Sequence, residues 1–82
     1  MNSIETRRLR RTTVNLSVLG FGGAAIGELW SPIPEDQARA TVNTALAAGI
    51  SYFDTAPWYG RGLSEHRMGA ALRGVDRSSF VL

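Results

Sequence analysis

Apolar side chains recur at helical spacing in two parts of the chain. From Pro34, which suits the first helical position, apolar residues fall every three or four positions until Gly49 ends the pattern. They form one stripe of a helix: Ala38, Val42, Ala45 and Leu46. A second helix is predicted from Ser64, as its N-cap, to Gly74. Its inward stripe comprises Met68, Ala71 and Leu72.

The segments around these helices have the patterns of short strands and loops. Alternating apolar and polar residues over 8–16 predict a hairpin, and 17–23 predicts a buried strand that breaks into glycines. A loop follows to residue 33, and apolar runs at 50–53 and 79–82 predict two further strands. The order hairpin, strand, helix, strand, helix, strand is typical of a parallel α/β sheet with right-handed crossovers, in either a doubly wound fold or a barrel.

The composition bounds the size and the chemistry of the protein. The chain has 82 residues, 44% of them hydrophobic, which is enough for one small domain or part of one. It has no cysteine, which excludes disulfides and thiolate metal sites, and its single histidine, His66, argues against a histidine-based metal site. We therefore predict no metal and a reducing, cytoplasmic setting.

The charge of the chain is mild. Nine arginines, with no lysine, offset seven acidic residues and leave a formal charge of +2, which is too small for a nucleic-acid binder. Four arginines cluster in 6–11, which forms either a basic targeting arm or a solvated strand pair. Alternation over 12–18 favours the strand pair, because a signal peptide needs a continuous apolar core. No stretch approaches the ~18 apolar residues of a membrane helix, so we expect no membrane partner.

Two unusual stretches follow predicted strands, where parallel α/β folds bind their ligands. The first, GFGGAA at 20–25, fits the loose dinucleotide pattern G-x-G-x-x-A. A loop that contains Trp30 separates it from the next helix, whereas a phosphate-binding turn opens a helix directly. A glycine turn packed against something flat or bulky is therefore favoured over a Rossmann site.

The second stretch, DTAPWYG at 54–60, ends a strand on Asp54 and places Tyr59 five residues later. A tyrosine hydroxyl transfers protons near neutral pH only when a neighbouring cation stabilises its phenolate, and a carboxylate can hold such a cation. Asp54 is thus interpretable as the orienter of a catalytic cation and Tyr59 as a proton donor. Alternatively, Asp54 caps the following turn and Tyr59 packs on Trp58. Spacing alone does not decide between these interpretations.

Three motifs occur in order along the chain: GISYFDTA at 49–56, YG at 59–60 and SEHRMG at 64–69. Together they resemble the signature of the aldo-keto reductase family, and LSVLGFG at 16–22 resembles the first strand of that family. The resemblance covers nearly all of the chain. Residues 54–73 most resemble the branch that oxidises aldoses, such as L-fucose and D-threo-aldoses, or pyridoxal.

The resemblance implies a (β/α)8 TIM barrel plugged by an N-terminal hairpin. Residues 1–82 would be the N-terminal portion of that single domain, an incomplete barrel of the hairpin and about three βα units. The implied reaction is hydride transfer between NADP or NAD and a small-molecule carbonyl or sugar, with a tetrad of aspartate, tyrosine, lysine and histidine. By motif match, the catalytic residues are Asp54 and Tyr59. Those beside the nicotinamide are Gly22, Gly23, Ala24 and Asp54, and those lining the substrate pocket are Trp58 and Trp30.

The chain departs from the family pattern in several respects. Arg10 and Thr13 stand where the hairpin of the family usually has glycines. The tetrad lysine, expected at the end of the third strand, is absent, as are the tetrad histidine and the late phosphate-binding loops. His66 falls on the second helix, where we predict an exposed position rather than a catalytic one.

Three interpretations of the chain therefore stay open. It is the amino-terminal portion of an enzyme, a non-catalytic nucleotide-binding or regulatory module on the same scaffold, or a degenerate fragment. Three strands cannot close a barrel, so we expect the face that carries Tyr52 to meet water and the isolated chain to be marginally stable. Without the lysine and the missing remainder of the barrel, we also expect it to be inactive.

Overall fold

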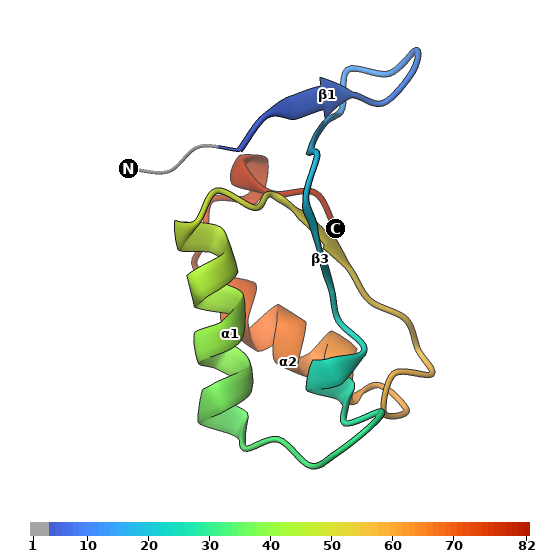
Figure 1. Cartoon of the computed structure of the whole chain (residues 1–82), viewed down its shortest axis with the longest axis vertical. Helices are drawn as coiled ribbons and strands as arrows, with labels where there is room; N and C mark the ends of the chain where they lie inside the picture. Colours follow the sequence, from blue (N-terminus) through green and yellow to red (C-terminus); the bar gives the residue numbers. More distant parts are fainter. Residues whose placement is uncertain (1–3) are drawn as a thin grey trace.

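Residues 4–82 of the computed structural model form a short parallel sheet backed by two helices, with a hairpin at one end (Figure 1). The chain follows the predicted order of strands and helices. The elements are β1 (Thr6–Arg8), β2 (Asn15–Ser17), β3 (Gly20–Gly22), η1 (Ala25–Gly27), α1 (Glu35–Ala47), β4 (Tyr52–Asp54), α2 (Leu63–Leu72) and η2 (Arg77–Ser79). Here η denotes a short 3₁₀ helix. None of the helices within residues 4–82 is long and apolar enough to cross a membrane.

The parallel sheet brings together segments that are far apart in the sequence. β3 and β4 pair in parallel, with Phe21 opposite Phe53 and Gly22 opposite Asp54. Val81 adds a parallel bridge to Tyr52, and its backbone bonds to both neighbours of Tyr52. The strand predicted at 79–82 is therefore present only as this bridge, because Ser79 closes η2, whose N-cap Asp76 accepts from the Ser78 amide. The parallel pairing of β3 and β4 across the intervening helix confirms the parallel sheet that the alternating pattern predicted.

The predicted strand at 17–23 is wrong in one respect, because the structure divides it. Ser17 ends β2 of the antiparallel hairpin, opposite Thr6, and the parallel strand begins only at Gly20. The buried Ser17 hydroxyl stabilises the break: it donates to the Leu19 carbonyl (2.7 Å) and accepts from the Ser51 amide (2.9 Å). Residues 18 and 19 are exposed at this bend, so their apolar character misleads a pattern-based assignment.

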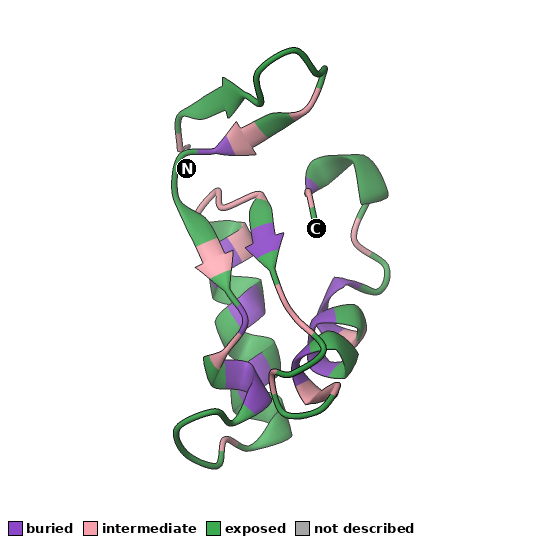
Figure 2. Cartoon of the chain, turned by 90° about the vertical axis from the view of Figure 1, so that its right-hand side faces the viewer, coloured by how far each residue is buried: buried purple, intermediate pink, exposed green. Residues whose placement is uncertain are grey.

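The core lies between the sheet and the two helices (Figure 2). Phe53 is fully buried and packs on Phe21 and Phe80, with ring centroids 5.6 and 6.4 Å apart. The predicted helix stripes are confirmed, since their members are buried except Leu46, which is half-buried: Ala38, Val42, Ala45, Leu46, Met68, Ala71 and Leu72. On the opposite face of the sheet, Tyr52 is 38% exposed, as expected for an open barrel face.

Both helices begin at a different residue from the predicted one. Pro34 is the N-cap of α1 rather than its first residue. Ser64 is the second residue of α2, and Gly62, with φ 95°, is the N-cap. The reason is that the Ser64 hydroxyl has a tertiary partner: it lies 2.8 Å from the hydroxyl of Thr55, which follows β4. A side chain committed to that contact does not cap the helix.

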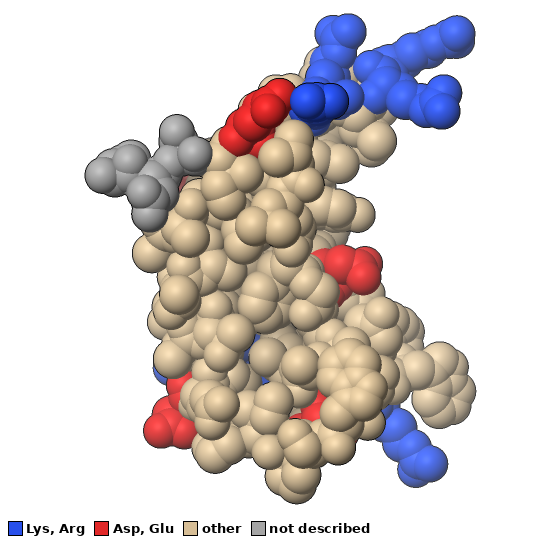
Figure 3. All heavy atoms as spheres, in the orientation of Figure 1, with Lys and Arg blue, Asp and Glu red and all other residues tan. Residues whose placement is uncertain are grey.

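The hairpin carries the arginine cluster, and the interpretation as a solvated strand pair is confirmed. Residues 7, 8, 10 and 11 are all exposed, and Figure 3 shows their side chains spreading outward at the hairpin end of the molecule. Arg7 pairs with Glu5 at 3.1 Å, an exposed contact worth little to stability. Arg10, at the turn of the hairpin, has φ 43°.

Replacing Arg10 with glycine is expected to stabilise the fold by about 1 kcal/mol, since a left-handed conformation costs a non-glycine residue roughly 1–2 kcal/mol and glycine loses part of this gain to chain entropy. Denaturant unfolding of the natural protein measures the change. Thr13→Gly is the matched control, because Thr13 does not have a positive φ, and it should destabilise. A lower unfolding midpoint for Arg10→Gly would contradict the assignment of strain to this turn.

Candidate active site

The two unusual stretches of the sequence meet at one edge of the sheet. β3 and β4 end in register, with Gly22 opposite Asp54, and the Gly23 amide continues the ladder by donating to the Asp54 carbonyl at 2.8 Å. The glycine turn and the DTAPWYG loop therefore leave the sheet side by side. This edge is the carboxyl end of both strands, where parallel α/β folds bind ligands.

Asp54 presents its carboxylate away from the helices. Its neighbour Phe53 is buried against them, and successive side chains of a strand point to opposite faces, so Asp54 lies on the exposed face with Tyr52. The hydrogen bonds and ion pairs formed within residues 4–82 do not use this carboxylate. Within residues 4–82 the Asp54 side chain thus does not cap the following turn, and its carboxylate has no protein partner there.

Tyr59 lies in the loop between β4 and α2, and hydrogen bonds fix its backbone on both sides. Its amide donates to the carbonyl of Ala56, and its carbonyl accepts from the amide of Ser64, both at 3.1 Å. Tyr59 is half-buried, and the aromatic pairs within residues 4–82 are formed by phenylalanines, so packing of Tyr59 on Trp58 is not observed there. These hydrogen bonds fix the backbone of Tyr59 within the loop that follows β4.

Gly27, which sequence reasoning missed, packs together with Gly60 of the YG motif where η1 meets this loop. A Cβ at Gly27 would lie 2.5 Å from the Tyr59 carbonyl oxygen, and a Cβ at Gly60 would collide with the Gly27 carbonyl. Gly60 also has φ 74°, which favours glycine. η1 thus packs backbone to backbone on the Tyr59 loop. The only signal for Gly27 in the sequence was an isolated glycine in a predicted loop.

Besides Asp54, three residues are expected beside a nicotinamide, and they differ in their surroundings. Gly22 is exposed, and a Cβ there would meet nothing within 4 Å, which leaves an open surface on which a flat ring could lie. Gly23 is buried, and a Cβ there would lie 2.6 Å from the Ser64 hydroxyl and 2.7 Å from the Asp54 carbonyl. Ala24 is half-buried and leads into η1. The glycine turn therefore packs closely against α2, in line with the predicted close packing of a glycine turn, and leaves Gly22 exposed.

The two tryptophans are the most exposed aromatic side chains of the site region. Trp58 is 78% exposed and lines an open groove with Pro57 and Arg61, whereas Trp30, 76% exposed, lies outside the lining of that groove. The described residues therefore bring Trp58, and not Trp30, into a groove beside the Tyr59 loop. His66 is exposed on α2, as predicted. Residues 4–82 contain no cluster of three or more His, Asp or Glu side chains placed to hold a metal ion.

Residues 18–82 match the model of the Aldo/keto reductase family. The chain belongs to that family. The curated relatives include L-galactose dehydrogenase of Arabidopsis thaliana, 42% identical over 84 residues, which cover 100% of this chain and 26% of the relative. D-threo-aldose 1-dehydrogenase of Pseudomonas sp is 46% identical over 67 residues, covering 82% of this chain and 20% of the relative. Pyridoxal 4-dehydrogenase of Microbacterium luteolum is 40% identical over 73 residues, covering 89% and 21%.

A solved structure of a family member confirms the fold of this aldo-keto reductase chain. An aldo-keto reductase of Bacillus halodurans, in its holo form, superposes with a TM-score of 0.84 at 35% identity, over 96% of this chain and 24% of that one. The neighbour is a TIM barrel, so β1 to α2 correspond to the hairpin and the first helices of an incomplete barrel. The doubly wound alternative is thereby excluded. The chain spans about a fifth to a quarter of the length of these relatives.

Aldo-keto reductases generally use NAD(P)H, and the residues at the strand ends fit such a group in part. A Cβ at Gly22 would meet nothing within 4 Å, so this surface leaves room for a flat ring, and Asp54 provides a carboxylate opposite it at the same edge. The sites for the phosphates would lie elsewhere in the barrel. Asp54 and Tyr59, the two residues expected by motif match to belong to the tetrad, are both present in residues 4–82, whereas residues 1–82 contain no lysine.

Proposed function

We propose that this chain belongs to an NAD(P)-dependent aldose dehydrogenase. Such an enzyme transfers a hydride between the nicotinamide and the C1 carbon of a sugar, and so interconverts the sugar and its lactone. Related carbonyl compounds are alternative substrates. The observation that carries the proposal is the register of the strand ends: it places the Asp54 carboxylate opposite the open Gly22, with the Tyr59 loop immediately following. The three relatives named above act, by their names, on L-galactose, D-threo-aldose and pyridoxal, which supports a sugar or a similar aldehyde.

Tyr59 is the proton-transfer residue in this proposal. In the oxidative direction its phenolate oxygen takes the proton from the sugar hydroxyl, and in reduction the resulting Tyr59 hydroxyl donates that proton to the carbonyl oxygen. Asp54 acts as an orienting carboxylate that holds a lysine ammonium next to the phenolate. The lysine and the tetrad histidine would come from residues outside 1–82. We therefore propose that the 82-residue chain alone is inactive and that it forms part of one barrel domain, of which residues 1–3 lie outside the described structure.

The nicotinamide supplies the hydride acceptor or donor when it is bound. Within this chain, Gly22 keeps the surface beside Asp54 free of side-chain atoms, while Gly23 and Ala24 continue the backbone from that surface into η1. Trp58 offers an exposed aromatic face to the apolar C–H face of a sugar, and Trp30 is proposed as a second wall of the substrate pocket. The individual sugar, the preference for NAD or NADP and the cytoplasmic location stay predictions.

Turnover by the natural protein that contains this chain tests the proposal. The purified protein is incubated with L-galactose, L-fucose, a D-threo-aldose or pyridoxal, each with NAD⁺ and with NADP⁺, and formation of the reduced cofactor is followed by absorbance. We expect turnover of at least one aldose with one of the two cofactors. Cofactor binding by calorimetry without turnover of any substrate would instead favour the non-catalytic nucleotide-binding module.

Substitution of Gly22 by valine tests the placement of the nicotinamide. Because a Cβ at Gly22 meets nothing within 4 Å, the fold should tolerate the larger side chain, whereas a bound ring would collide with it. We expect the Kd for NAD(P)H to rise at least about tenfold, the cost of roughly 1.4 kcal/mol of lost contact. Gly69→Val on the exposed face of α2 is the control, since Gly69 is equally open. An unchanged Kd for Gly22→Val would place the cofactor elsewhere.

A further inference from the structure

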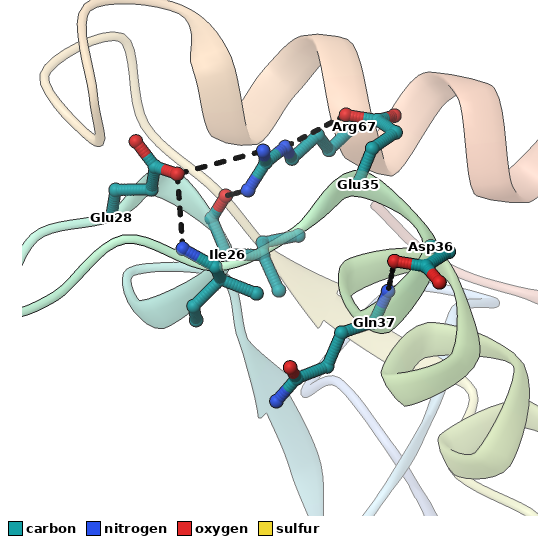
Figure 4. Close-up of polar contacts among 7 residues, drawn as sticks. Ile26, Glu28, Glu35, Asp36, Gln37 and Arg67 are labelled. Carbon is teal, nitrogen blue, oxygen red and sulfur yellow. Dashed lines mark hydrogen bonds and ion pairs between the residues drawn. The ribbon is translucent and has the colours of Figure 1, made fainter.

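Arg67 is a buried charged residue, and the residues that it contacts are not part of the family motifs. Its side chain, on α2, is only 9% exposed, although arginine is almost never buried without partners. Figure 4 shows its guanidinium between α2 and two segments from the first half of the chain. Its Nη1 donates to the Ile26 carbonyl at 3.1 Å, its Nε donates to Glu35 at 3.0 Å, and its Nη2 lies 3.6 Å from Glu28.

These three partners belong to one continuous segment, which the guanidinium holds near both ends. Ile26 is in η1, and Glu35 is the first residue of α1. Between them, Glu28 uses the oxygen that faces Arg67 to accept from the Ile33 amide at 3.0 Å, which closes the intervening loop on itself. Trp30 lies within this closed loop. We call the segment from residue 26 to residue 35 the clamped loop.

The clamped loop also touches the candidate active site. Gly27, next to Ile26, is the glycine whose backbone packs on the Tyr59 carbonyl, and the chain turns at Gly60 against the Gly27 carbonyl. η1 therefore contacts both parts of the structure: its Ile26 carbonyl accepts from Arg67, and its Gly27 packs against the Tyr59 loop. A movement of η1 away from α2 would remove the support under Tyr59 and displace Trp30 at the same time.

We propose that Arg67 is a positioning residue: by fixing the clamped loop to α2, it sets the placement of the Tyr59 loop and of the segment that carries Trp30. This inference rests on the proposed function. The planar guanidinium presents several N–H donors in fixed directions, so one side chain can satisfy a carbonyl and two carboxylates at once. Lysine has the same net charge, but it is concentrated on one ammonium group, which cannot reproduce the hydrogen-bond directions of the guanidinium.

Arg67→Lys in the natural protein tests the proposal, with hydrogen exchange and steady-state kinetics as readouts. Exchange should accelerate in peptides covering residues 24–34 and 55–62, while the interior of α1 keeps its wild-type exchange. We expect kcat to fall about tenfold, as for a misplaced proton-transfer group, and the sugar KM to rise as Trp30 moves. The cofactor Kd should stay within about twofold, which corresponds to a change of about 0.4 kcal/mol in binding free energy. The reason is that the contacts of Arg67 are with Ile26, Glu28 and Glu35 and not with Gly22 or Asp54. Arg73→Lys, on an exposed arginine that follows α2, is the matched control and should leave every readout unchanged.

Three results would overturn the proposal. Unchanged exchange in both peptides would show that Arg67 does not hold the clamped loop. A lower melting temperature with wild-type kcat and KM would show a role in stability alone. If Arg67→Lys does not fold, Glu28→Gln, which alters the more distant carboxylate, should still accelerate exchange at 24–34, and its failure to do so would also overturn it. If the unsubstituted protein shows no turnover, the proposed function fails, whereas hydrogen exchange still decides whether Arg67 clamps the loop.

Discussion

Replacing Tyr59 with phenylalanine is expected to lower kcat by about 10²–10⁴-fold, the usual contribution of a positioned general acid or base. The substitution removes only the hydroxyl, and the loop that carries Tyr59 is held by backbone bonds to Ala56 and Ser64 that phenylalanine preserves. The Kd for NAD(P)H should therefore stay close to that of the unsubstituted protein. Steady-state kinetics and calorimetry on the natural protein measure the two quantities separately.

Tyr52 supplies a matched control for this experiment. It is the other tyrosine of the chain and lies on β4, two residues before Asp54. Tyr52→Phe removes the same hydroxyl group as Tyr59→Phe does. Tyr52→Phe should retain kcat to within a few-fold, since it is not in the DTAPWYG loop. Equal losses of kcat in both variants, or a loss of cofactor affinity as large as the loss of kcat in Tyr59→Phe, would contradict the proton-transfer role.

Gly27→Ala is the second substitution for which we expect a large effect, although Gly27 carries no reactive group. The added methyl would lie 2.5 Å from the Tyr59 carbonyl oxygen, whereas ordinary contacts begin at 3.4 Å. The backbone of the Tyr59 loop must therefore shift by roughly 1 Å, and a misplacement of that size costs about 10²-fold in rate. We expect this loss in kcat, with accelerated hydrogen exchange at residues 55–62.

Gly69→Ala is the control for this methyl group. Gly69 lies within α2 and has open space around it, so alanine there should stabilise the helix by up to about 1 kcal/mol without a change in kcat. Wild-type kcat in Gly27→Ala would show that η1 does not support Tyr59. Such a result would also remove one step from the argument for Arg67.

The helices and the order of elements could be predicted because they depend on local patterns. Apolar residues at helical spacing, such as Val42 and Met68, are the ones that the fold buries. The boundaries were less predictable, because tertiary contacts decide them. Ser64 has the sequence pattern of an N-cap but bonds to Thr55, and Ser17 stabilises a bend inside a predicted strand.

The candidate site divides in the same way. Asp54 and Tyr59 follow from a motif that is contiguous in the sequence, and the structure adds that Gly22 lies opposite Asp54. The contacts of Arg67 join residues 41 and 32 positions apart, so no local pattern indicates them. The fit of Gly27 against Tyr59 likewise depends on how two loops pack after the sheet has formed.

Transfer of a labelled hydride tests the central claim most directly. The natural protein that contains this chain is given an aldose with deuterium on C1 together with the oxidised cofactor, and the reduced cofactor is examined by mass spectrometry. The account predicts that the reduced nicotinamide carries the deuterium, and that Tyr59→Phe slows its appearance by at least about 10²-fold. Reduced cofactor without deuterium, or transfer at the same rate in the variant, would contradict it.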